Sequence, residues 1–302
     1  MRIVVTGATG FLGKYVVRRL EEEGCELTLM GTSLERLRQI YSDESLRKIE
    51  TDYISADLEC QTQGQQYDAV VHLAAKRLDS NGLLADFADN IRITENILRW
   101  CDTCGIGRII MASSQSVYRN GINMPPFHEE DAYARGIGKA YGYAYSKYIC
   151  EQLAYHYQTP MISLRFGQLL GWGEKKGFMF STQLDKVQHG EPIVLWGNGG
   201  GGRDYLYCKD AVEAILAAIV LSEAKTEAYN VSMGCPISFR EFAETLVDVF
   251  GNAESKIIYD HTKQEDTSVR FMSLDKATEV LGWQPRYNLR SAFVDMQKES
   301  NI

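Results

Sequence analysis

The chain has 302 residues, with 32 lysines and arginines against 40 aspartates and glutamates and a formal net charge of -8 at pH 7. Its length suits two domains or one α/β unit with an additional lobe, and its 45% apolar and 24% charged residues are typical of a folded protein. A sequence-independent binder of nucleic acid needs an excess of clustered cations, which this chain lacks, so we expect neither a nucleic-acid partner nor a membrane partner.

The sequence shows no pattern of a membrane span or a secretion signal. The apolar run Ala214–Leu221 has eight residues, well short of the roughly 18 that a spanning helix needs. Met1–Thr6 is typical of a strand rather than of a signal peptide. Seven cysteines, an odd number, favour reduced thiols, and the CxxC pair Cys101 and Cys104 has no second pair of ligands nearby. We therefore expect a cytoplasmic protein without a metal site.

Residues 1–165 alternate short β-branched runs with amphipathic helical stretches, the pattern of a parallel sheet covered on both faces. The predicted strands are Arg2–Thr6, Glu26–Met30, Asp52–Ala56, Ala69–Leu73, Arg108–Ala112 and Met161–Leu164. Crossover helices are predicted at Phe11–Glu23 and Leu83–Cys104, because apolar residues gather on one helical face of each. The fold class is therefore α/β, with a doubly wound parallel sheet.

After Arg165 the pattern changes to Gly-rich loops at Gly171–Gly177 and Gly197–Gly202, separated by helical stretches. The predicted helices are Phe178–His189, Lys209–Ser222 and Ser238–Phe250. We interpret residues 166–302 as mainly a smaller C-terminal lobe, with elements near 203–222 and 270–281 that return to the first sheet.

A glycine-rich turn, Thr6–Gly13, follows the first strand and opens the first helix. Gly7 permits a tight turn, Gly10 lets the backbone approach a pyrophosphate at the helix N-terminus, and Gly13 lets the helix pack closely on the sheet. The spacing is GxxGxxG rather than the commoner GxGxxG, and a glycine-rich turn in an unrelated α/β protein is the alternative. The context predicts a dinucleotide-binding domain over residues 1–165.

Three further residues can carry proton transfer. Tyr143 and Lys147 are four residues apart on a predicted helix and therefore share one face. A nearby cation lowers the pKa of a phenol, which makes a tyrosine a usable acid or base. Ser114, at the end of the fifth predicted strand, can hydrogen-bond the same substrate oxygen. A chance YxxxK match in a tyrosine-rich helix is the alternative, and the coincidence of all these signals argues against it.

These residues, together with later segments, resemble the extended short-chain dehydrogenase/reductases, specifically the NAD-dependent epimerase/dehydratase family acting on nucleotide sugars. Leu164–Gly171 is similar to that family's LRxxNxYG segment, and Arg203–Tyr207 with Asp210 is similar to its RDYxxVxD segment. Tyr229–Val231 and Leu281–Pro285 match later landmarks, so the resemblance covers nearly the whole chain.

The resemblance implies a Rossmann fold, an NAD or NADP cofactor and a role for each matching residue. Tyr143 would be the catalytic base with Ser114 as its partner, and Lys147 would also bind the nicotinamide ribose. The other cofactor contacts would be Gly7, Gly10, Phe11, Leu12 and Gly13 at the pyrophosphate, Asp57 and Leu58 at the adenine, and Ala74 and Ala75 beside the ribose. Ser114, Tyr143, Arg203 and Arg270 would bind the nucleotide sugar, the two arginines at its phosphates. A homodimer through the helices of Asn90 and Tyr143 is also implied.

Departures from the family pattern bear on specificity. Gly31 stands at the end of the second strand, where NAD enzymes usually place an acid, while Thr32, Ser33 and Arg36 can hold a 2'-phosphate. This predicts dual or NADP-leaning cofactor use. Gln115 and Ser116 replace the Asp-Glu pair of the family's 4,6-dehydratases. Gln168 replaces a usual asparagine, and Gly199–Gly202 is expected to be a mobile loop.

The leading hypothesis for function is a UDP-sugar 4-epimerase acting through a transient 4-keto intermediate. The first alternative is an NADPH-dependent nucleotide-4-keto-sugar reductase, and a 4,6-dehydratase ranks below both. A member that binds dinucleotide without catalysis is the alternative from another class. His72 is expected to be a core residue rather than a catalyst.

Overall fold

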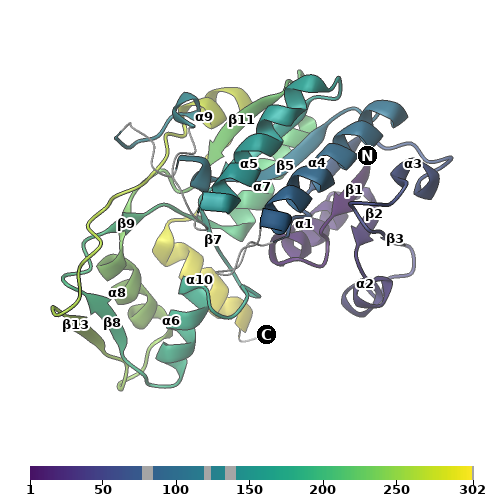
Figure 1. Cartoon of the computed structure of the whole chain (residues 1–302). Coiled ribbons are helices and arrows are strands. Elements are labelled where there is room, and N and C mark those ends of the chain that lie inside the picture. The colour runs from purple at the N-terminus through teal and green to yellow at the C-terminus, as the bar shows by residue number, and fades with distance from the viewer. Residues whose placement is uncertain (77–83, 119–123, 133–140, 301–302) are drawn as a thin grey trace.

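The computed structural model describes residues 1–76, 84–118, 124–132 and 141–300, and its centre is a seven-stranded parallel sheet (Figure 1). The strand order is β11-β6-β5-β4-β1-β2-β3. The strands are β1 (Arg2–Thr6), β2 (Glu26–Gly31), β3 (Arg47–Glu50), β4 (Ala69–His72), β5 (Ile109–Ser114), β6 (Met161–Phe166) and β11 (Glu227–Val231). The order reverses between β1 and β4, which is where open α/β sheets leave a crevice for ligands.

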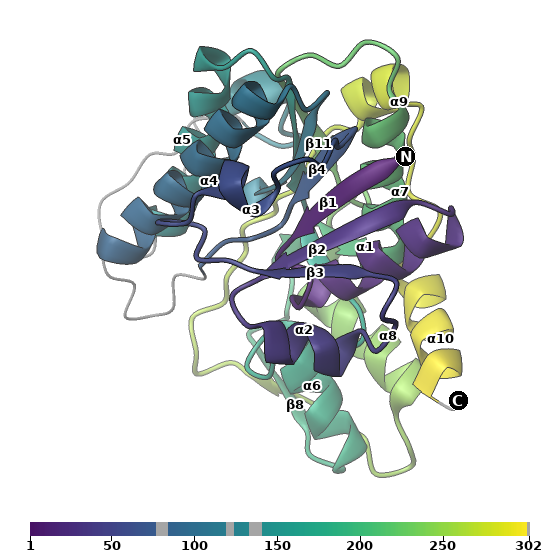
Figure 2. The same cartoon turned by 90° about the vertical axis from the view of Figure 1, so that its right-hand side faces the viewer.

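Helices cover both faces of this sheet (Figure 2). They are α1 (Phe11–Glu22), α2 (Leu34–Ile40), α3 (Leu58–Gln61), α4 (Leu84–Cys104), α5 (Gly142–Leu153), α7 (Cys208–Val220) and α9 (Asp275–Leu281). Val16 of α1 and Ile215 of α7 belong to the core on one face, while Leu98 of α4 and Cys150 of α5 belong to the core on the other. Burial on both faces explains the continuous apolar runs in the central strands. Within the described residues, no helix has both the length and the apolar character of a membrane span.

The predicted strand at Asp52–Ala56 is wrong, because these residues form a turn. The Asp52 carboxylate accepts hydrogen bonds from Ile54 N at 3.0 Å and Ser55 Oγ at 2.7 Å, and Asp52 O accepts from Ala56 N at 2.8 Å. Aspartate commonly starts such turns. The strand at this place is the more polar β3, which lies at the sheet edge beside β2. The other predicted strands and helices recur with small shifts of their ends, and predicted helix residue Leu83 lies outside the described residues.

The second lobe is built around a separate core that includes Phe180, Phe242 and Phe293. Its helices are α6 (Met179–Gln188), α8 (Phe239–Phe250) and α10 (Leu289–Ser300). Three two-stranded pairs complete it: β7 (Gln168–Leu170) with β10 (Tyr205–Tyr207), β9 (Gly202–Arg203) with β12 (Ile237–Ser238), and β8 (Ile193–Trp196) with β13 (Ile257–Asp260). The chain then returns from this lobe to the seven-stranded sheet. There β11 pairs with β6, and α7 and α9 contribute to the core on one face of the sheet.

Candidate active site

The glycine-rich turn lies at the reversal point of the sheet, between β1 and α1. Gly7 has a φ of +68°, and a Cβ there would lie 2.8 Å from Ala74 N. A Cβ on Gly13 would lie 2.5 Å from Gly7 O, so only glycine lets α1 approach this closely. No described side chain caps the start of α1, which leaves backbone N–H groups of its first turn open to an anion. The turn therefore fits the pyrophosphate of a dinucleotide.

Tyr53 bonds to the glycine-rich turn, and it is not among the site residues predicted from the sequence. Its hydroxyl accepts a hydrogen bond from Gly7 N at 3.1 Å, and its side chain is 5% exposed. Burial raises the pKa of Tyr53 above its ordinary range, so the hydroxyl stays protonated. No sequence spacing predicts this contact, because Tyr53 reaches Gly7 through the turn that begins at Asp52.

His72 is a core residue, as its sequence context predicted. Its Nδ1 lies 2.9 Å from Thr6 Oγ1 and its Nε2 lies 3.3 Å from Thr94 Oγ1. Thr94 donates onward to Asn90 O at 3.0 Å, so Nε2 donates to Thr94 and Nδ1 accepts from Thr6 in a consistent chain. Burial lowers the pKa of His72 to about 3, and the nearby Lys147 ammonium adds to the effect. A histidine that stays neutral and fully paired supports the turn rather than moving protons.

The predicted adenine and ribose contacts lie on two short segments. Asp57 and Leu58 line a cavity of about 410 Å³ beside α3. The Asp57 carboxylate caps that helix by accepting from Cys60 N at 3.0 Å, while the Leu58 side chain is buried in the core. Ala74 donates its N–H to Thr6 Oγ1 at 3.2 Å, and Ala75 is exposed beside it.

The proton-transfer residues converge at the carboxyl end of β5. Lys147 Nζ donates to Ala112 O at 2.6 Å and lies 5.8 Å from the centre of the Tyr143 ring. This bond uses one of the three ammonium protons and ties α5 to the strand that ends at Ser114. Ser114 Oγ accepts from Ser116 N at 3.2 Å, which leaves its own proton available to a substrate oxygen.

A buried ion pair lies directly behind these residues. Arg165 of β6 donates to both carboxylate oxygens of Glu151 of α5, with Nη2 2.7 Å from Oε2 and Nε 3.1 Å from Oε1. Ser113 Oγ donates to the same carboxylate, and Arg165 Nη1 donates to the Tyr118 hydroxyl at 2.8 Å. The sequence reasoning did not identify Glu151, although it lies one helical turn beyond Lys147, on the same face, and this spacing is a usable signal.

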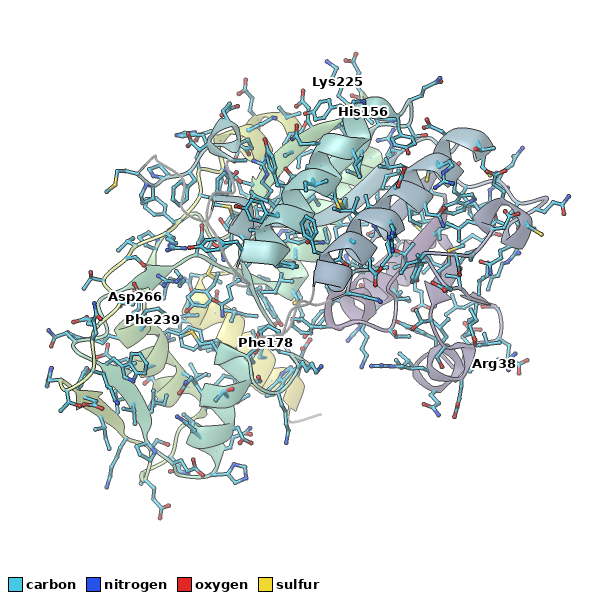
Figure 3. All side chains as sticks on the ribbon, viewed as in Figure 1. Arg38, His156, Phe178, Lys225, Phe239 and Asp266 are labelled. Carbon is cyan, nitrogen blue, oxygen red and sulfur yellow. The ribbon has the colours of Figure 1, made fainter. Side chains whose placement is uncertain are left out.

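A second cavity, of about 380 Å³, borders the end of β5. It is lined by Gln115, Ser116, Tyr118, Phe127, Gln168, Arg203, Asp266 and Arg270. The structure therefore brings together both arginines predicted for the substrate and three of the positions that depart from the family pattern, Gln115, Ser116 and Gln168. A neighbouring cavity of about 310 Å³, lined by Leu195, Trp196 and Phe239, shares Asp266 with it; Asp266 and Phe239 lie side by side in Figure 3.

Arg203 already has partners in this arrangement. Its guanidinium forms an ion pair with Asp266 and donates to Ser268 O at 2.9 Å. Hydrogen bonds from Ser268 and Arg203 lower the pKa of Asp266 to about 2, so the carboxylate is charged. The Gly199–Gly202 loop is tied to the same segment through Gly202 N and Ser268 O at 3.0 Å. A phosphate that binds Arg203 must therefore share the guanidinium with Asp266.

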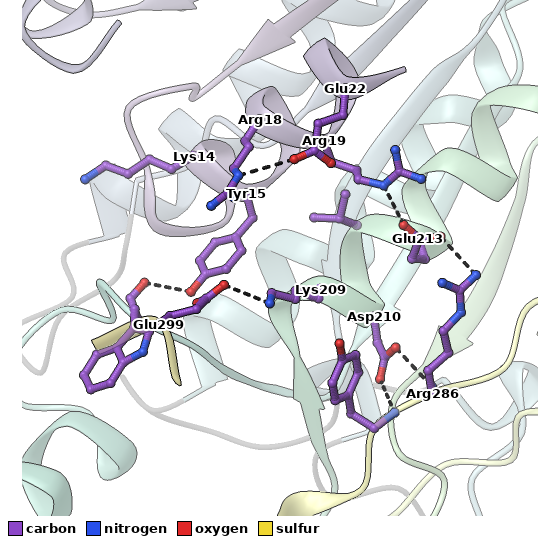
Figure 4. Close-up of a pocket in the computed structure, with 13 residues that line it drawn as sticks. Lys14, Tyr15, Arg18, Arg19, Glu22, Lys209, Asp210, Glu213, Arg286 and Glu299 are labelled. Atoms are coloured by element: carbon purple, nitrogen blue, oxygen red, sulfur yellow. Dashed lines mark hydrogen bonds and ion pairs between the residues drawn. The ribbon is translucent and has the colours of Figure 1, made fainter. Parts of the chain in front are cut away.

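A cavity of about 490 Å³ lies elsewhere, between α1, α7 and α10 (Figure 4). Several of its charged groups are paired with one another, including Arg19 with Glu213 at 2.8 Å and Lys209 with Glu299 at 2.8 Å. Tyr15 donates to Trp172 O at 3.1 Å on its wall. The cavity at the end of β5, by contrast, is lined by Gln115 and Ser116, which directly follow Ser114, and by Arg203 and Arg270, so it is the candidate active site.

The family model described as "NAD dependent epimerase/dehydratase family" matches residues 3–232. The chain belongs to this family. This match confirms the resemblance to the epimerase/dehydratase family that the sequence predicted. The family and its relatives also confirm the predicted Rossmann fold and an NAD(P)-dependent enzyme.

Similar proteins of this family carry several activities. The chain is 29% identical to a dTDP-4-dehydro-6-deoxy-D-allose reductase from Streptomyces bikiniensis, over 94% of this chain and 91% of that protein. It is 24% identical to a UDP-glucuronate 4-epimerase from Thermodesulfobacterium geofontis, over 98% and 96%. The structure of a UDP-N-acetylglucosamine 4-epimerase from Bacillus cereus matches with a TM-score of 0.84 at 28% identity, over 100% and 96%. The proteins that this chain resembles therefore include nucleotide-sugar epimerases and a reductase.

Proposed function

We propose that the protein is a UDP-sugar 4-epimerase that works through a transient 4-keto sugar. The observation that supports the proposal is that Tyr143, the predicted proton-transfer group, has Lys147 Nζ 5.8 Å from its ring centre, and that Lys147 is bonded to the strand that ends at Ser114. An epimerase needs only one such group, because the proton and hydride that leave C4 also return to it. The residue roles assigned above are part of this proposal.

In the proposed reaction, Tyr143 takes the proton of the C4 hydroxyl while Ser114 donates a hydrogen bond to the same oxygen. The Lys147 ammonium near the ring offsets the negative charge that Tyr143 carries as the phenolate before it takes this proton. A bound nicotinamide supplies the acceptor, and later the donor, of the C4 hydride. Between these steps the 4-keto sugar rotates in the cavity to present its other face. Tyr143 then returns its proton to the C4 oxygen.

The neighbouring side chains argue against elimination of water. A 4,6-dehydratase needs a further acid and base close to the sugar, and Gln115 and Ser116 line the cavity at the positions where that family branch has carboxylates. Neither an amide nor a hydroxyl replaces a carboxylate in this role. Dehydration is therefore ranked last.

The reductase is the second candidate, supported by the 29% identity to the Streptomyces bikiniensis enzyme. Both reactions use Tyr143 in the same way, but only the reductase consumes reduced cofactor. Two incubations of the purified protein separate them, one with UDP-glucose, UDP-galactose or UDP-glucuronate and one with NADPH and a nucleotide 4-keto sugar. NMR follows the sugars and absorbance follows the nicotinamide. An epimerase interconverts C4 epimers without net cofactor change. Stoichiometric NADPH loss with a 4-keto sugar, and no epimer formation, would refute the proposal in favour of reduction.

A homodimer through α4 and α5 remains a prediction. Light scattering coupled to size-exclusion chromatography tests it directly, and a monomer at the working concentration would contradict it.

A further inference from the structure

The corner that receives the adenosine ribose in this fold lies after β2, and here it contains a carboxylate from a neighbouring strand. Gly31, the last residue of β2, contributes no side chain. Glu50, the last residue of β3, is its partner in the parallel register, and Thr51 N donates to Gly31 O at 2.9 Å. The two strand ends are thus adjacent, so an acid at either can reach the loop that follows β2.

Glu50 does reach that loop. Its Oε2 accepts a hydrogen bond from Leu34 N, the first residue of α2, at 2.7 Å. Ser33 Oγ accepts from Arg36 N at 3.2 Å, so the side chains of Glu50 and Ser33 together occupy N–H groups at this helix start. Gln61 Nε2 donates to Glu50 O at 3.3 Å and steadies the strand end. The carboxylate is therefore positioned at the loop formed by Thr32 and Ser33.

Glu50 and Arg36 have opposite effects on the binding of a 2'-phosphate at this corner. A 2'-phosphate carries about −1.5 to −2 at neutral pH and would have to displace the Glu50 carboxylate from Leu34 N or lie beside it. Arg36 could attract the phosphate, but its side chain is exposed and, in the part of the chain that the structure describes, has no hydrogen bond that orients it. Exposed ion pairs are weak. A 2'-hydroxyl meets no such penalty, because it can donate to the second oxygen of Glu50.

We propose that Glu50 sets the cofactor preference of this enzyme in favour of NAD over NADP. The carboxylate that is missing from the end of β2 is supplied by β3, at the same corner of the crevice. This proposal runs against the NADP-leaning use that Gly31, Thr32 and Arg36 suggested in the sequence. It also rests on the proposed function, because a bound NAD that is regenerated in each turnover suits an epimerase better than a reductase that consumes NADPH.

The test is calorimetric titration of the full-length protein with NAD⁺ and with NADP⁺, without any sugar. Wild type is expected to bind NAD⁺ at least tenfold more tightly. Glu50→Gln keeps an oxygen that can accept from Leu34 N but removes the charge, so it should reduce the ratio of the two affinities by about tenfold. Glu35→Gln removes an exposed carboxylate of α2 whose hydrogen bond within the described residues is accepted from Gln39 Nε2. This control should leave the ratio unchanged.

Two results would overturn the proposal: wild type preferring NADP⁺, or an unchanged ratio of the two affinities in Glu50→Gln. An unchanged ratio with an equal loss of both affinities would indicate a structural role alone. A thermal melt of each variant shows that it is folded before titration. The titration does not depend on catalysis, so a protein that prefers NAD⁺ but epimerises no UDP-sugar would refute the proposed function and leave the role of Glu50 standing.

Discussion

Glu151 of α5 and Arg165 of β6 form a two-pronged ion pair inside the protein, at 4% and 5% side-chain exposure, next to the strand end that presents Ser114. The pair joins α5, which carries Tyr143 and Lys147, to the sheet beside the candidate active site. Ser113 adds a hydrogen bond from β5 to the same carboxylate. The Glu151 carboxylate therefore connects three elements, α5, β5 and β6, two of which contain the predicted proton-transfer residues.

Removing half of this pair should destabilise the fold strongly. Glu151→Gln leaves the Arg165 charge buried without its counter-charge, and such changes cost about 3–5 kcal/mol in the free energy of unfolding. Urea denaturation followed by circular dichroism measures the loss. Arg18→Ala is the control, because the Arg18–Glu22 pair is 78% and 54% exposed and should change stability by only about 0–1 kcal/mol. Similar losses in the two variants would contradict this account of the buried pair.

Tyr143→Phe should remove activity while preserving cofactor binding. The substitution deletes only the hydroxyl that moves the proton, and general acid–base groups commonly contribute about 10²- to 10⁴-fold. Turnover of the accepted nucleotide sugar, with NAD⁺ affinity measured separately, checks the expectation. Tyr155→Phe, at an exposed tyrosine just beyond the same helix, should leave turnover unchanged. Equal activities of Tyr143→Phe and wild type would remove Tyr143 from the mechanism.

Arg203→Lys should raise the KM for the nucleotide sugar about tenfold or more, with a small change in kcat. Lysine keeps the charge but loses the planar fork that can hold Asp266 and a phosphate at once. Steady-state kinetics on the preferred sugar gives both constants. Arg38→Lys, on α2 and labelled far from the second lobe in Figure 3, is the matched control. A lower kcat at constant KM would place Arg203 in the chemical step instead.

His72 should make the protein less stable in acid. Its pKa is about 3 in the folded chain and near 6.5 when unfolded, so the unfolded state binds the extra proton between these values. The free energy of unfolding therefore falls as the pH drops from 6.5 toward 3. His72→Gln removes this contribution, so its stability should fall less steeply over the same window. Urea midpoints at several pH values compare the slopes, and groups common to both proteins cancel in the difference. Parallel slopes would show that His72 already has the same pKa in both states.

The sequence predicted the parts of this molecule that depend on local pattern. β1 and the start of α1 follow from a buried apolar run and from three glycines whose spacing is visible in the chain. Tyr143 and Lys147 follow from helical spacing. These features need no knowledge of which distant segments meet.

The features that were missed depend on long-range contacts or on turn chemistry. Tyr53 reaches Gly7 because Asp52 starts a turn, and the sequence pattern of Asp52–Ala56 instead predicted a strand. Glu50 enters the cofactor corner through the pairing of β3 with β2, which no local pattern reveals. Asp266 meets Arg203 from a segment about sixty residues later, so its competition for the guanidinium could not be predicted.

Strand β11 has a consequence for how the chain folds. It pairs Val231 with Phe166 of β6, yet residues 167–226, which include β7, α6 and α7, separate the two strands in the chain. A fragment ending at residue 165 would lack this strand and the α7 helix that covers Ile162 and Leu164 in the core. The cofactor-binding layer is therefore not an autonomous folding unit, and the two halves of the chain should unfold in a single cooperative transition.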